Sequence, residues 1–256
     1  MLANDRHNKI LEMLERDGSV RNSKLVTIFE VSLETVRRDL DFLEKQGLLQ
    51  KVHGGAILNS KNKENANQTY IVRETKNIEE KREIAALALK FINENETIAL
   101  NSSTTSIEIA RLIKDKFTSL TVVTNSLRIA EELADKKGIN LILAGGIYNK
   151  NEFAFLGEIT ERFLNEFIVD KAFVSVGGIS LKRGITDFLI DEVIVERKMI
   201  KIAEEAIILA DSSKIGSNSL IKVCDTEEVD FIITDSKFKD EDKEIYLQNG
   251  IKIINR

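Results

Sequence analysis

Residues 32–42 have the sequence Ser-Leu-Glu-Thr-Val-Arg-Arg-Asp-Leu-Asp-Phe, and this stretch decides the fold class of the N-terminal part of the chain. Ser32 can cap a helix, because its hydroxyl can accept a hydrogen bond from one of the first backbone N–H groups. Apolar residues then recur at steps of three and four and share one buried stripe: Leu33, Val36, Leu40 and Leu43. The pattern predicts an amphipathic helix that ends at Gly47, with Arg38 nearly opposite the stripe and Arg37 on its flank. Phe42 also faces away from the stripe, and the hairpin described next is one candidate partner for its ring.

Further elements surround this helix. Helical patterns precede it over residues 5–16 and 22–29. Two short strands follow it over residues 48–52 and 56–58, because His53-Gly54-Gly55 between them favours a tight hairpin turn. Two helices, a turn, a third helix and a hairpin form the order of a winged helix-turn-helix domain, whose third helix enters the major groove of DNA. We therefore expect such a domain over residues 1–58.

The predicted DNA contacts lie on the third helix, on the start of the second and on the hairpin. They are Arg21, Lys24, Ser32, Glu34, Thr35, Arg37, Arg38, Lys51, His53 and Gly54. Residues 1–58 carry nine basic and nine acidic side chains, so DNA affinity must come from the local placement of the basic ones rather than from net charge. The alternative interpretation is that Arg37 and Arg38 are solvated helix charges paired with Glu34 and Asp41.

These motifs resemble those of a known family. Val31-Ser32-x-x-Thr35-Val36-Arg37-Arg38-Asp39-Leu40, followed by Leu43-x-x-x-Gly47 and by His53-Gly54-Gly55-Ala56, is similar to the DeoR family of bacterial transcription regulators. One departure is Glu30, which stands in the turn where that family often has glycine. Glutamate adopts a left-handed backbone less readily than glycine does.

Composition narrows the remaining possibilities. The chain has 256 residues, 43% of them hydrophobic, which is enough for one small and one larger core. It has no long uncharged apolar run and no secretory signal, so we expect a cytoplasmic protein that does not associate with a membrane. One cysteine and two histidines exclude a disulfide framework and a dedicated zinc site, and no cofactor is predicted. Cys224 is expected to be a small packed residue, and His7 a packed helix residue.

A polar segment without apolar periodicity, residues 59–69, is the predicted linker to a second domain over residues 70–256. In that domain helical and strand patterns alternate. Helices are expected over residues 78–91, 107–117, 127–136 and 191–203, and strands over residues 97–100, 120–124, 140–144, 171–176, 206–210 and 231–234. Because the strands are continuously apolar, the pattern predicts an α/β domain with a mostly parallel sheet that is covered on both faces.

Ligands bind beyond the carboxyl ends of the strands in such sheets, so the residues that follow each strand are the candidate site. They are Asn101, Ser102, Ser103, Thr104, Thr105, Thr124, Asn125, Gly145, Gly146, Gly177, Gly178, Asp211 and Lys214. Hydroxyls and unpaired N–H groups at a helix start favour an anion, glycine lets backbone approach it, and Lys214 can supply a counter-charge. Each loop alone is an ordinary cap or turn, whereas their shared position predicts a phosphorylated small molecule.

The resemblance extends over this domain. It rests on these motifs: Arg73-x-x-x-Asn77, Lys81, Ile84-Ala85, residues 121–126, Gly145-Gly146, residues 170–173, Gly184-Ile185-Thr186 and residues 211–214. The resemblance implies a fold like that of the ribose-phosphate isomerases and a role in sensing sugar phosphates. One departure lies in the first loop, where the family commonly has Asp-x-Gly-Thr-Thr and this chain has residues 101–105, Asn-Ser-Ser-Thr-Thr.

The leading hypothesis is a transcription repressor of a carbohydrate-utilisation operon that binds operator DNA as a homodimer or homotetramer and responds to a phosphorylated sugar. One alternative is a sugar-phosphate isomerase. Residues 176–180 lack the carboxylate that this chemistry would need there, although Asp187 or Asp211 could substitute. We therefore predict that the protein is not an enzyme. A further alternative is a constitutive DNA-binding protein whose second domain only forms oligomers.

Overall fold

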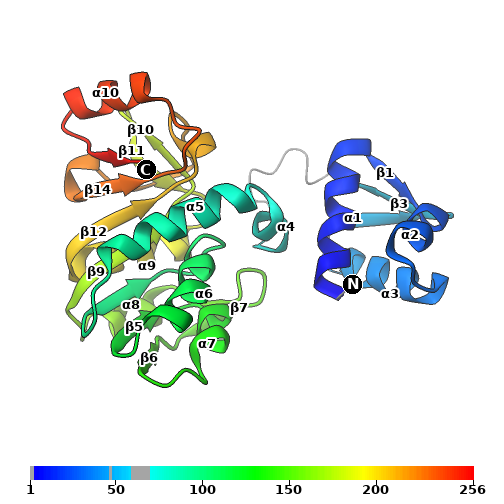
Figure 1. Cartoon of the computed structure of the whole chain (residues 1–256), viewed down its shortest axis with the longest axis horizontal. Coiled ribbons are helices and arrows are strands. Elements are labelled where there is room, and N and C mark those ends of the chain that lie inside the picture. The colour runs from blue at the N-terminus through cyan, green and yellow to red at the C-terminus, as the bar shows by residue number, and fades with distance from the viewer. Residues whose placement is uncertain (1–2, 46–47, 59–69) are drawn as a thin grey trace. The chain divides into compact units, whose positions relative to one another are not determined.

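The computed structural model describes residues 3–45, 48–58 and 70–256 (Figure 1). The chain divides into two compact units, Met1–Lys76 and Asn77–Arg256. The expected linker, residues 59–69, and the expected helix end at Gly47 lie outside the described residues. No helix among the described residues is long and apolar enough to cross a membrane.

The first unit is a winged helix-turn-helix domain. Its elements are α1 (Ala3–Asp17), β1 (Ser19–Arg21), α2 (Asn22–Phe29), α3 (Leu33–Lys45), β2 (Leu49–Val52), β3 (Gly55–Leu58) and α4 (Tyr70–Thr75). The apolar stripes of the helices form one core, in which Leu14 of α1, Leu25 of α2 and Leu40 of α3 are fully or almost fully buried. Leu33 does not join the stripe as expected, because it opens the first turn of α3 beyond the core and is 42% exposed.

A third strand that the sequence analysis did not predict completes the wing. β1 pairs with β3 in an antiparallel sheet of order β1-β3-β2, and Val20 of β1 pairs with Ala56. A Cβ atom on Gly55 would lie 2.0 Å from the carbonyl oxygen of Val20, so only glycine fits where β1 passes. Gly54 has a positive φ of 82°, which forms the hairpin turn.

Helix α4 differs from the expected domain division. The sequence analysis placed its residues in the second domain, whereas the contacts assign them to the first unit. Ile71 and Val72 of α4 pack against the core of the first unit, and α4 contacts α1. The apolar side chains of α4 therefore extend the core of the first unit.

The second unit contains a seven-stranded parallel sheet of order β15-β14-β12-β9-β4-β5-β6 (Figure 1). Its strands are β4 (Thr97–Leu100), β5 (Leu120–Thr124), β6 (Ile139–Leu143), β9 (Val169–Ser175), β12 (Ala203–Leu209), β14 (Phe231–Ile233) and β15 (Ile253–Ile254). Every pairing in this sheet is parallel, which confirms the predicted fold class.

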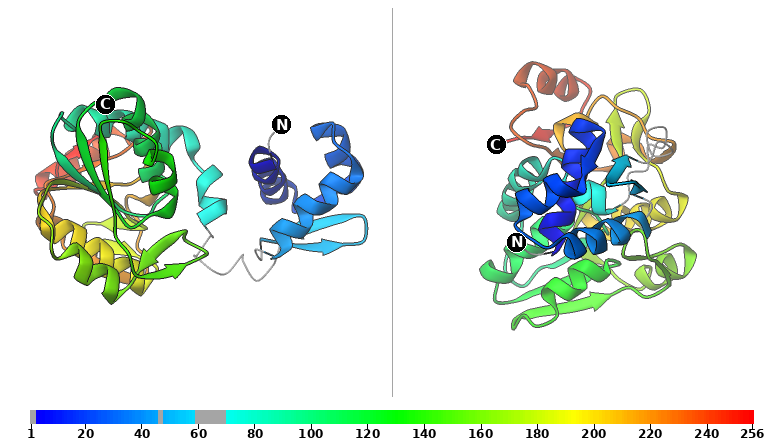
Figure 2. Two further views of the ribbon diagram at one scale, coloured as in Figure 1. Left: turned by 90° about the horizontal axis from the view of Figure 1, so that it is seen from below. Right: turned by 90° about the vertical axis from the view of Figure 1, so that its right-hand side faces the viewer.

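Helices cover both faces of this sheet, as Figure 2 also shows. They are α5 (Ile78–Ala88), α6 (Ser106–Lys116), α7 (Leu127–Leu133), α8 (Glu158–Leu164), α9 (Ile190–Ile202) and α10 (Asp240–Gln248). Successive strand residues point to opposite faces, so Ile98 packs in the core under α5, α6 and α7, whereas Ala99 packs in the core under α8, α9 and α10. Two separate apolar cores therefore hold the sheet.

Short elements lie at the carboxyl edge of the sheet. They are the hairpin of β7 (Ile147–Asn149) and β8 (Ala154–Leu156), an antiparallel sheet of β10 (Gly178–Ser180), β11 (Gly184–Asp187) and β13 (Ile221–Cys224), and the 3-10 turn η3 (Ser212–Lys214). The 3-10 turns η2 (Leu89–Phe91) and η4 (Thr226–Glu228) instead precede β4 and β14, at the amino ends of these strands. Cys224 lies buried in β13, as expected for a packed residue, and burial raises its thiol pKa to about 12. β10 begins three residues after β9 ends, which brings this small sheet to the candidate ligand site.

Candidate functional site

Helix α3 begins as the sequence predicts. The Ser32 hydroxyl accepts a hydrogen bond of 3.1 Å from the backbone N–H of Thr35, and the Ser32 carbonyl accepts one from Val36. The preceding turn contains Glu30 with φ 54° and ψ 42°, a left-handed conformation at the end of α2. This turn therefore has the geometry that glycine favours, although it is built here with a glutamate.

The outer face of α3 presents its charges to solvent. Arg38 and Glu34 form an ion pair at 3.6 Å, but their side chains are 78% and 63% exposed. Such a pair is worth only about 0.3–0.5 kcal/mol, so Arg38 is readily released to another anion. Arg37 is exposed as well and forms no ion pair with any residue that the structure describes. The pairing alternative therefore applies to Arg38 and Glu34, and not to Arg37.

A buried acid on the inner side of α3 fixes this helix against α1. Asp39, 5% exposed, accepts two hydrogen bonds from Arg6, at 2.7 and 3.1 Å. His7 Nε2 lies 2.9 Å from the same carboxylate, and its ring stacks on Phe42 at 4.7 Å. The partner of Phe42 is thus His7 and not the hairpin, and His7 is a packed residue as expected. The sequence analysis missed Asp39, whose position between Val36 and Leu40 on the stripe was the available signal.

The wing is attached to α3 by a lysine that was expected to contact DNA phosphates. The Lys51 ammonium forms an ion pair with Asp41, and its backbone N–H donates to Glu44 at 2.7 Å. These two contacts position the wing on the helix, and the contact of Lys51 with a DNA phosphate stays a prediction. His53 and Gly54 lie exposed at the hairpin tip, where the Gly54 carbonyl accepts a hydrogen bond from Asn22.

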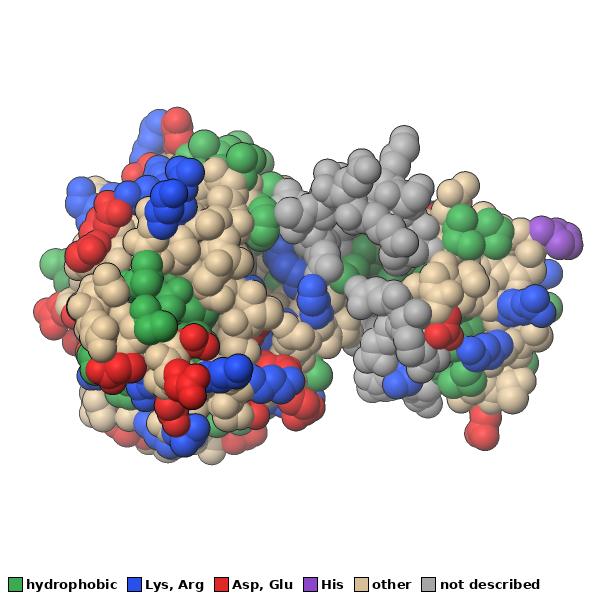
Figure 3. All heavy atoms as spheres, turned by 90° about the horizontal axis from the view of Figure 1, so that it is seen from above, with side chains coloured by type: hydrophobic (Ala, Val, Ile, Leu, Met, Phe, Trp, Pro, Cys, Tyr) green, Lys and Arg blue, Asp and Glu red, His purple; other side chains and the backbone are tan. Residues whose placement is uncertain are grey.

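The other predicted contacts also lie on the surface of this unit. Arg21 is exposed at the end of β1, and Lys24 is exposed on α2, where it pairs at 3.3 Å with Asp17. Thr35 is half-buried beside its cap. Figure 3 shows basic side chains gathered on one visible face of the first unit, with fewer acidic ones among them.

At the second unit, Asn101 joins the carboxyl ends of β4 and β9. Its side-chain amide donates to the Ser175 carbonyl at 2.8 Å and accepts from the Ser175 N–H at 3.0 Å. The hydroxyl of Ser106 donates to the same Asn101 oxygen at 3.1 Å. These bonds give Asn101 a role in holding the ends of the two strands together, and its contact with a ligand stays a prediction.

The loop after Asn101 is held by its own polar side chains. Ser103 caps α6 by accepting a 2.8 Å hydrogen bond from the Ser106 N–H. Asn125, which follows β5, accepts from the Ser102 N–H at 3.0 Å and donates to the Ser102 hydroxyl at 3.2 Å. The hydroxyl of Thr124 donates to the Leu100 carbonyl at 2.7 Å. This network brings two neighbouring strand ends, those of β4 and β5, together into one buried surface.

The same loop leaves a row of donors unused. Within the described part of the chain, the backbone N–H groups of Ser103, Thr104 and Thr105 make no hydrogen bond. The hydroxyls of Thr104 and Thr105, 5% and 1% exposed, also make none there. Largely buried donors in native proteins normally have acceptors, and donors grouped before a helix favour an anion. This is the strongest ligand signal in the second unit.

On the other side of β9, the end of β12 supplies the charged groups. Lys214 donates to the Val176 carbonyl at 2.7 Å and so lies over the end of β9. Asp211, 4% exposed, caps the 3-10 turn η3 through the Ser213 N–H at 3.1 Å. Because β4, β9 and β12 are neighbours in the sheet, Lys214 and the Thr104 loop border the same edge.

Two residues at the start of helix α5 were not among the predicted site residues. Asn77, directly before α5, donates to Asp211 at 3.1 Å and to the Ser213 hydroxyl at 3.4 Å. Lys81 lies one helical turn later and is only 3% exposed. Both residues belong to the motifs that carry the family resemblance, which was the signal for including them.

The predicted glycines have different roles. A Cβ atom on Gly177 would lie 2.7 Å from the Ser219 hydroxyl oxygen and 2.9 Å from Asp187 Oδ1, and one on Gly178 would lie 2.9 Å from the Ser217 carbonyl. Close packing of β11 and the loop before β13 therefore requires both glycines. Gly145 and Gly146 follow the edge strand β6, two strands from β4, and are exposed. They do not join the Thr104 loop network.

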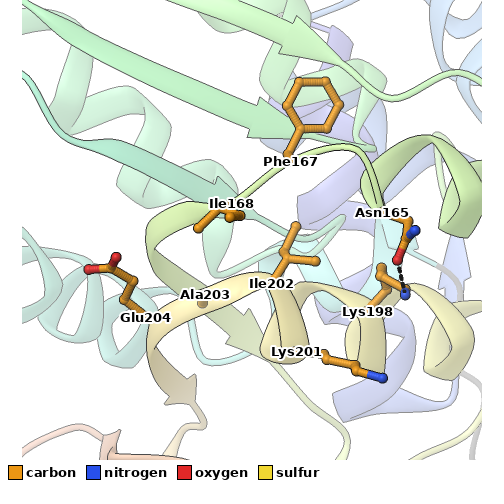
Figure 4. A pocket seen from close by; sticks show the side chains of 8 residues that line it. All are labelled: Asn165, Phe167, Ile168, Lys198, Lys201, Ile202, Ala203 and Glu204. Carbon is orange, nitrogen blue, oxygen red and sulfur yellow. Dashed lines mark hydrogen bonds between the residues drawn. The ribbon is translucent and has the colours of Figure 1, made fainter.

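A hollow of roughly 360 Å³ lies elsewhere on this unit (Figure 4). Its lining residues are Asn165, Phe167, Ile168, Lys198, Lys201, Ile202, Ala203 and Glu204. Ile168 precedes β9 and Ala203 begins β12, so the hollow is at the amino ends of these strands, whereas the predicted site is at their carboxyl ends. It contains none of the predicted site residues. No group of histidines, cysteines and acids that could hold a metal occurs within the described residues.

A winged helix-turn-helix unit followed by an α/β unit with donors at the sheet edge defines a ligand-responsive DNA-binding regulator. Residues 6–62 match the family model of the DeoR-like helix-turn-helix domain, and residues 76–236 match that of the DeoR C terminal sensor domain. The chain belongs to the DeoR family of transcription regulators, which confirms the predicted family and the interpretation as a regulator instead of an isomerase.

Named relatives are consistent with this assignment. The chain is 34% identical over 254 residues to the HTH-type transcriptional repressor GlcR of Bacillus subtilis (strain 168), covering 99% of this chain and 96% of that protein. It is 31% identical over 236 residues to the glycerol-3-phosphate regulon repressor of Escherichia coli (strain K12), covering 92% of each. The structure is similar to ribose 5 phosphate isomerase A from Neisseria gonorrhoeae over 58% of this chain and 56% of that one, with 17% identity and a TM-score of 0.41.

Proposed function

We propose that this protein represses a carbohydrate-utilisation operon by binding operator DNA through α3 and the wing, and that a phosphorylated sugar bound in the second unit changes this affinity. The observation that carries the proposal is the row of unused donors at residues 103–105, directly before α6 and at the same sheet edge as Lys214. A phosphate group accepts several hydrogen bonds at once and carries the negative charge that a helix start favours. The relatives described above are named as repressors, and one of them is the glycerol-3-phosphate regulon repressor, whose name contains a phosphorylated polyol.

Direct base contacts are assigned to the outer face of α3. Arg37 and Arg38 are exposed, and neither is held by a strong partner among the described residues. Arginine recognises guanine edges with two hydrogen bonds, whereas the cationic groups of Arg21 and Lys24 are suited to phosphates. Helix-turn-helix units usually bind two half-sites as a dimer, so we infer a homodimer or a homotetramer on the operator.

The effector must bind the DNA-competent and the released states unequally, since a ligand shifts an equilibrium only through its differential affinity. The decisive experiment is a thermal-shift screen of the full chain with phosphorylated sugars and their unphosphorylated counterparts. A ligand at about 100 times its Kd adds about 2.7 kcal/mol of stability. We expect a shift that requires the phosphate group and that decreases in Thr104→Val and Lys214→Ala.

The control variant is Lys182→Ala, which removes an exposed lysine from the turn between β10 and β11. It should respond to ligand like the unaltered protein. Operator binding is then measured with and without the stabilising sugar. If no phosphorylated sugar changes either stability or operator affinity, the sensing half of the proposal fails, and a constitutive DNA-binding protein with an oligomerising second unit takes its place.

A further inference from the structure

Three carboxyl groups are buried next to the proposed phosphate site. Asp187 ends β11, and Glu192 and Glu196 lie one turn apart on α9, with exposed fractions of 8%, 7% and 3%. Gly177 connects Asp187 with the end of β9. The Gly177 N–H donates to the Thr186 carbonyl at 3.1 Å, and a Cβ atom on Gly177 would lie 2.9 Å from Asp187 Oδ1. These acids are therefore at the carboxyl edge of the sheet, at the strand next to β4.

One carboxyl oxygen of these acids lacks a hydrogen-bond partner. Glu196 Oε2 is fully buried and has no hydrogen bond, whereas Asp187 Oδ1 accepts from the Phe188 N–H at 2.6 Å. Burial raises the pKa of Glu196 well above its usual range, the negative charges of Asp187 and Glu192 raise it further, and Lys214 opposes them. The buried Glu196 carboxyl therefore holds its proton more tightly than an exposed glutamate does, and its Oε2 remains an acceptor without a donor.

A purely structural role does not explain this arrangement. Replacing buried acids by apolar side chains of similar volume is often neutral or stabilising, so an unpartnered carboxyl oxygen adds nothing to the fold. Buried acceptors in native proteins normally have donors, and a bound molecule can supply the missing one.

The spacing suits a sugar phosphate. Neighbouring strands are about 5 Å apart, so the loop after β4, the acids at the end of β9 and Lys214 after β12 span about 10 Å. That is the length of a small phosphorylated sugar. A molecule whose phosphate occupies the donors of residues 103–105 therefore places its non-phosphorylated part across the end of β9, beside Asp187 and Glu196.

We propose that Asp187 and Glu196 select the effector at its non-phosphorylated end, where they accept hydroxyl groups and reject a second anionic group. The effector is then a monophosphate of a neutral sugar or polyol, and not a sugar-acid phosphate or a bisphosphate. This inference rests on the proposed function, because it requires that a phosphate group occupies the Thr104 loop.

The test compares matched probes on the full chain. Calorimetry measures the affinities of glycerol 3-phosphate against 3-phosphoglycerate, of glucose 6-phosphate against 6-phosphogluconate, and of inorganic phosphate alone. In each pair the acid replaces a neutral end with a carboxylate. We expect the unaltered protein to bind at least one neutral member at least tenfold more tightly than its acid partner.

Two variants locate this preference. Asp187→Asn keeps an acceptor for the Phe188 N–H, and Glu196→Met replaces the buried acid with an apolar side chain of similar volume. Both variants should reduce the ratio of the affinity for the neutral probe to the affinity for its acid partner severalfold. Their affinity for inorganic phosphate should stay within about twofold of that of the unaltered protein. The unchanged phosphate affinity also shows that the variants are folded.

Four results would overturn the inference. Equal affinity of the unaltered protein for a neutral probe and its acid partner would remove the selectivity, and an unchanged ratio in both variants would remove the role of these two residues. A parallel loss of all probes would show that the acids only support the pocket. If no phosphorylated probe or inorganic phosphate binds the unaltered protein, the proposed function fails first and the inference fails with it.

Discussion

Replacing Asp39 should loosen the recognition helix far more than any change on its outer face. The Asp39 carboxylate accepts two hydrogen bonds from Arg6, and the two side chains are only 6% and 11% exposed. Removing one partner of a buried ion pair costs about 3–5 kcal/mol, because the other charge stays buried after it has lost that partner. Arg6 retains some contact with water, so we place the cost of Asp39→Ala near the lower end, at about 3 kcal/mol.

A double-mutant cycle isolates the Arg6–Asp39 pair from other effects of the substitutions. The variants are Arg6→Ala, Asp39→Ala and both together, and the matched cycle uses the exposed pair Glu34 and Arg38 on the same helix. Urea unfolding is followed by hydrogen exchange of backbone amides in α1 and α3, so that the first unit is observed apart from the second. We expect a coupling energy of about 1.5–3 kcal/mol for the buried pair and about 0.5 kcal/mol or less for the exposed one.

The comparison between the two cycles decides the outcome. Similar coupling energies for both pairs would refute the conclusion that a buried acid holds α3 against α1. Asp39→Ala should lose operator affinity only in proportion to its loss of stability. Asp39 is buried and points away from the DNA-facing side of the helix, so it makes no direct contact with DNA.

Three further predictions concern single positions. Gly55→Ala should destabilise the first unit by more than about 3 kcal/mol in urea unfolding, because its Cβ would lie 2.0 Å from the Val20 carbonyl oxygen; a loss below about 1 kcal/mol would contradict the close approach of β1. Glu30→Gly should stabilise the first unit by about 1 kcal/mol in the same assay, since the φ of 54° strains a side chain that has a Cβ, and a destabilised variant would argue against this turn. Cys224 should react with a thiol reagent at neutral pH only after unfolding, since burial raises its pKa from 9.0 to about 12. Because the folded pKa is the higher one, the stability linked to this thiol is fully present below pH 9.0 and is lost as the pH rises toward about 12; rapid labelling of the folded chain would contradict this.

The sequence predicted the features that depend on local periodicity. The Ser32 cap, the stripe through Val36 and Leu40 and the parallel strands follow from spacing and from continuous apolar runs, which act over a few residues. The three-residue strand β1 was missed, because so short a segment has no period that distinguishes it from a loop. Its pairing with β3 becomes evident only from the structure, where Gly55 of β3 lies directly beside Val20 of β1.

The candidate sites were predicted less completely, for a physical reason. Residue type showed that Asn101, Lys51 and Lys214 could bind a ligand, but not that Asn101 joins two strands or that Lys51 pairs with Asp41. Such assignments depend on contacts between residues far apart in the chain. The same limit hid the nearness of Asp187 and Glu196, which belong to different elements and meet only after β11 and α9 have packed.

The position of Asn77 has a consequence for how such regulators can be recombined. This residue adopts a left-handed backbone, directly precedes α5 and donates to Asp211 and Ser213, yet it directly follows the last residue of the first unit. A chimera that takes its DNA-binding part from another family member keeps this edge of the ligand site only if the junction lies before Asn77. A junction even a few residues further on would exchange operator specificity and alter ligand recognition in the same step.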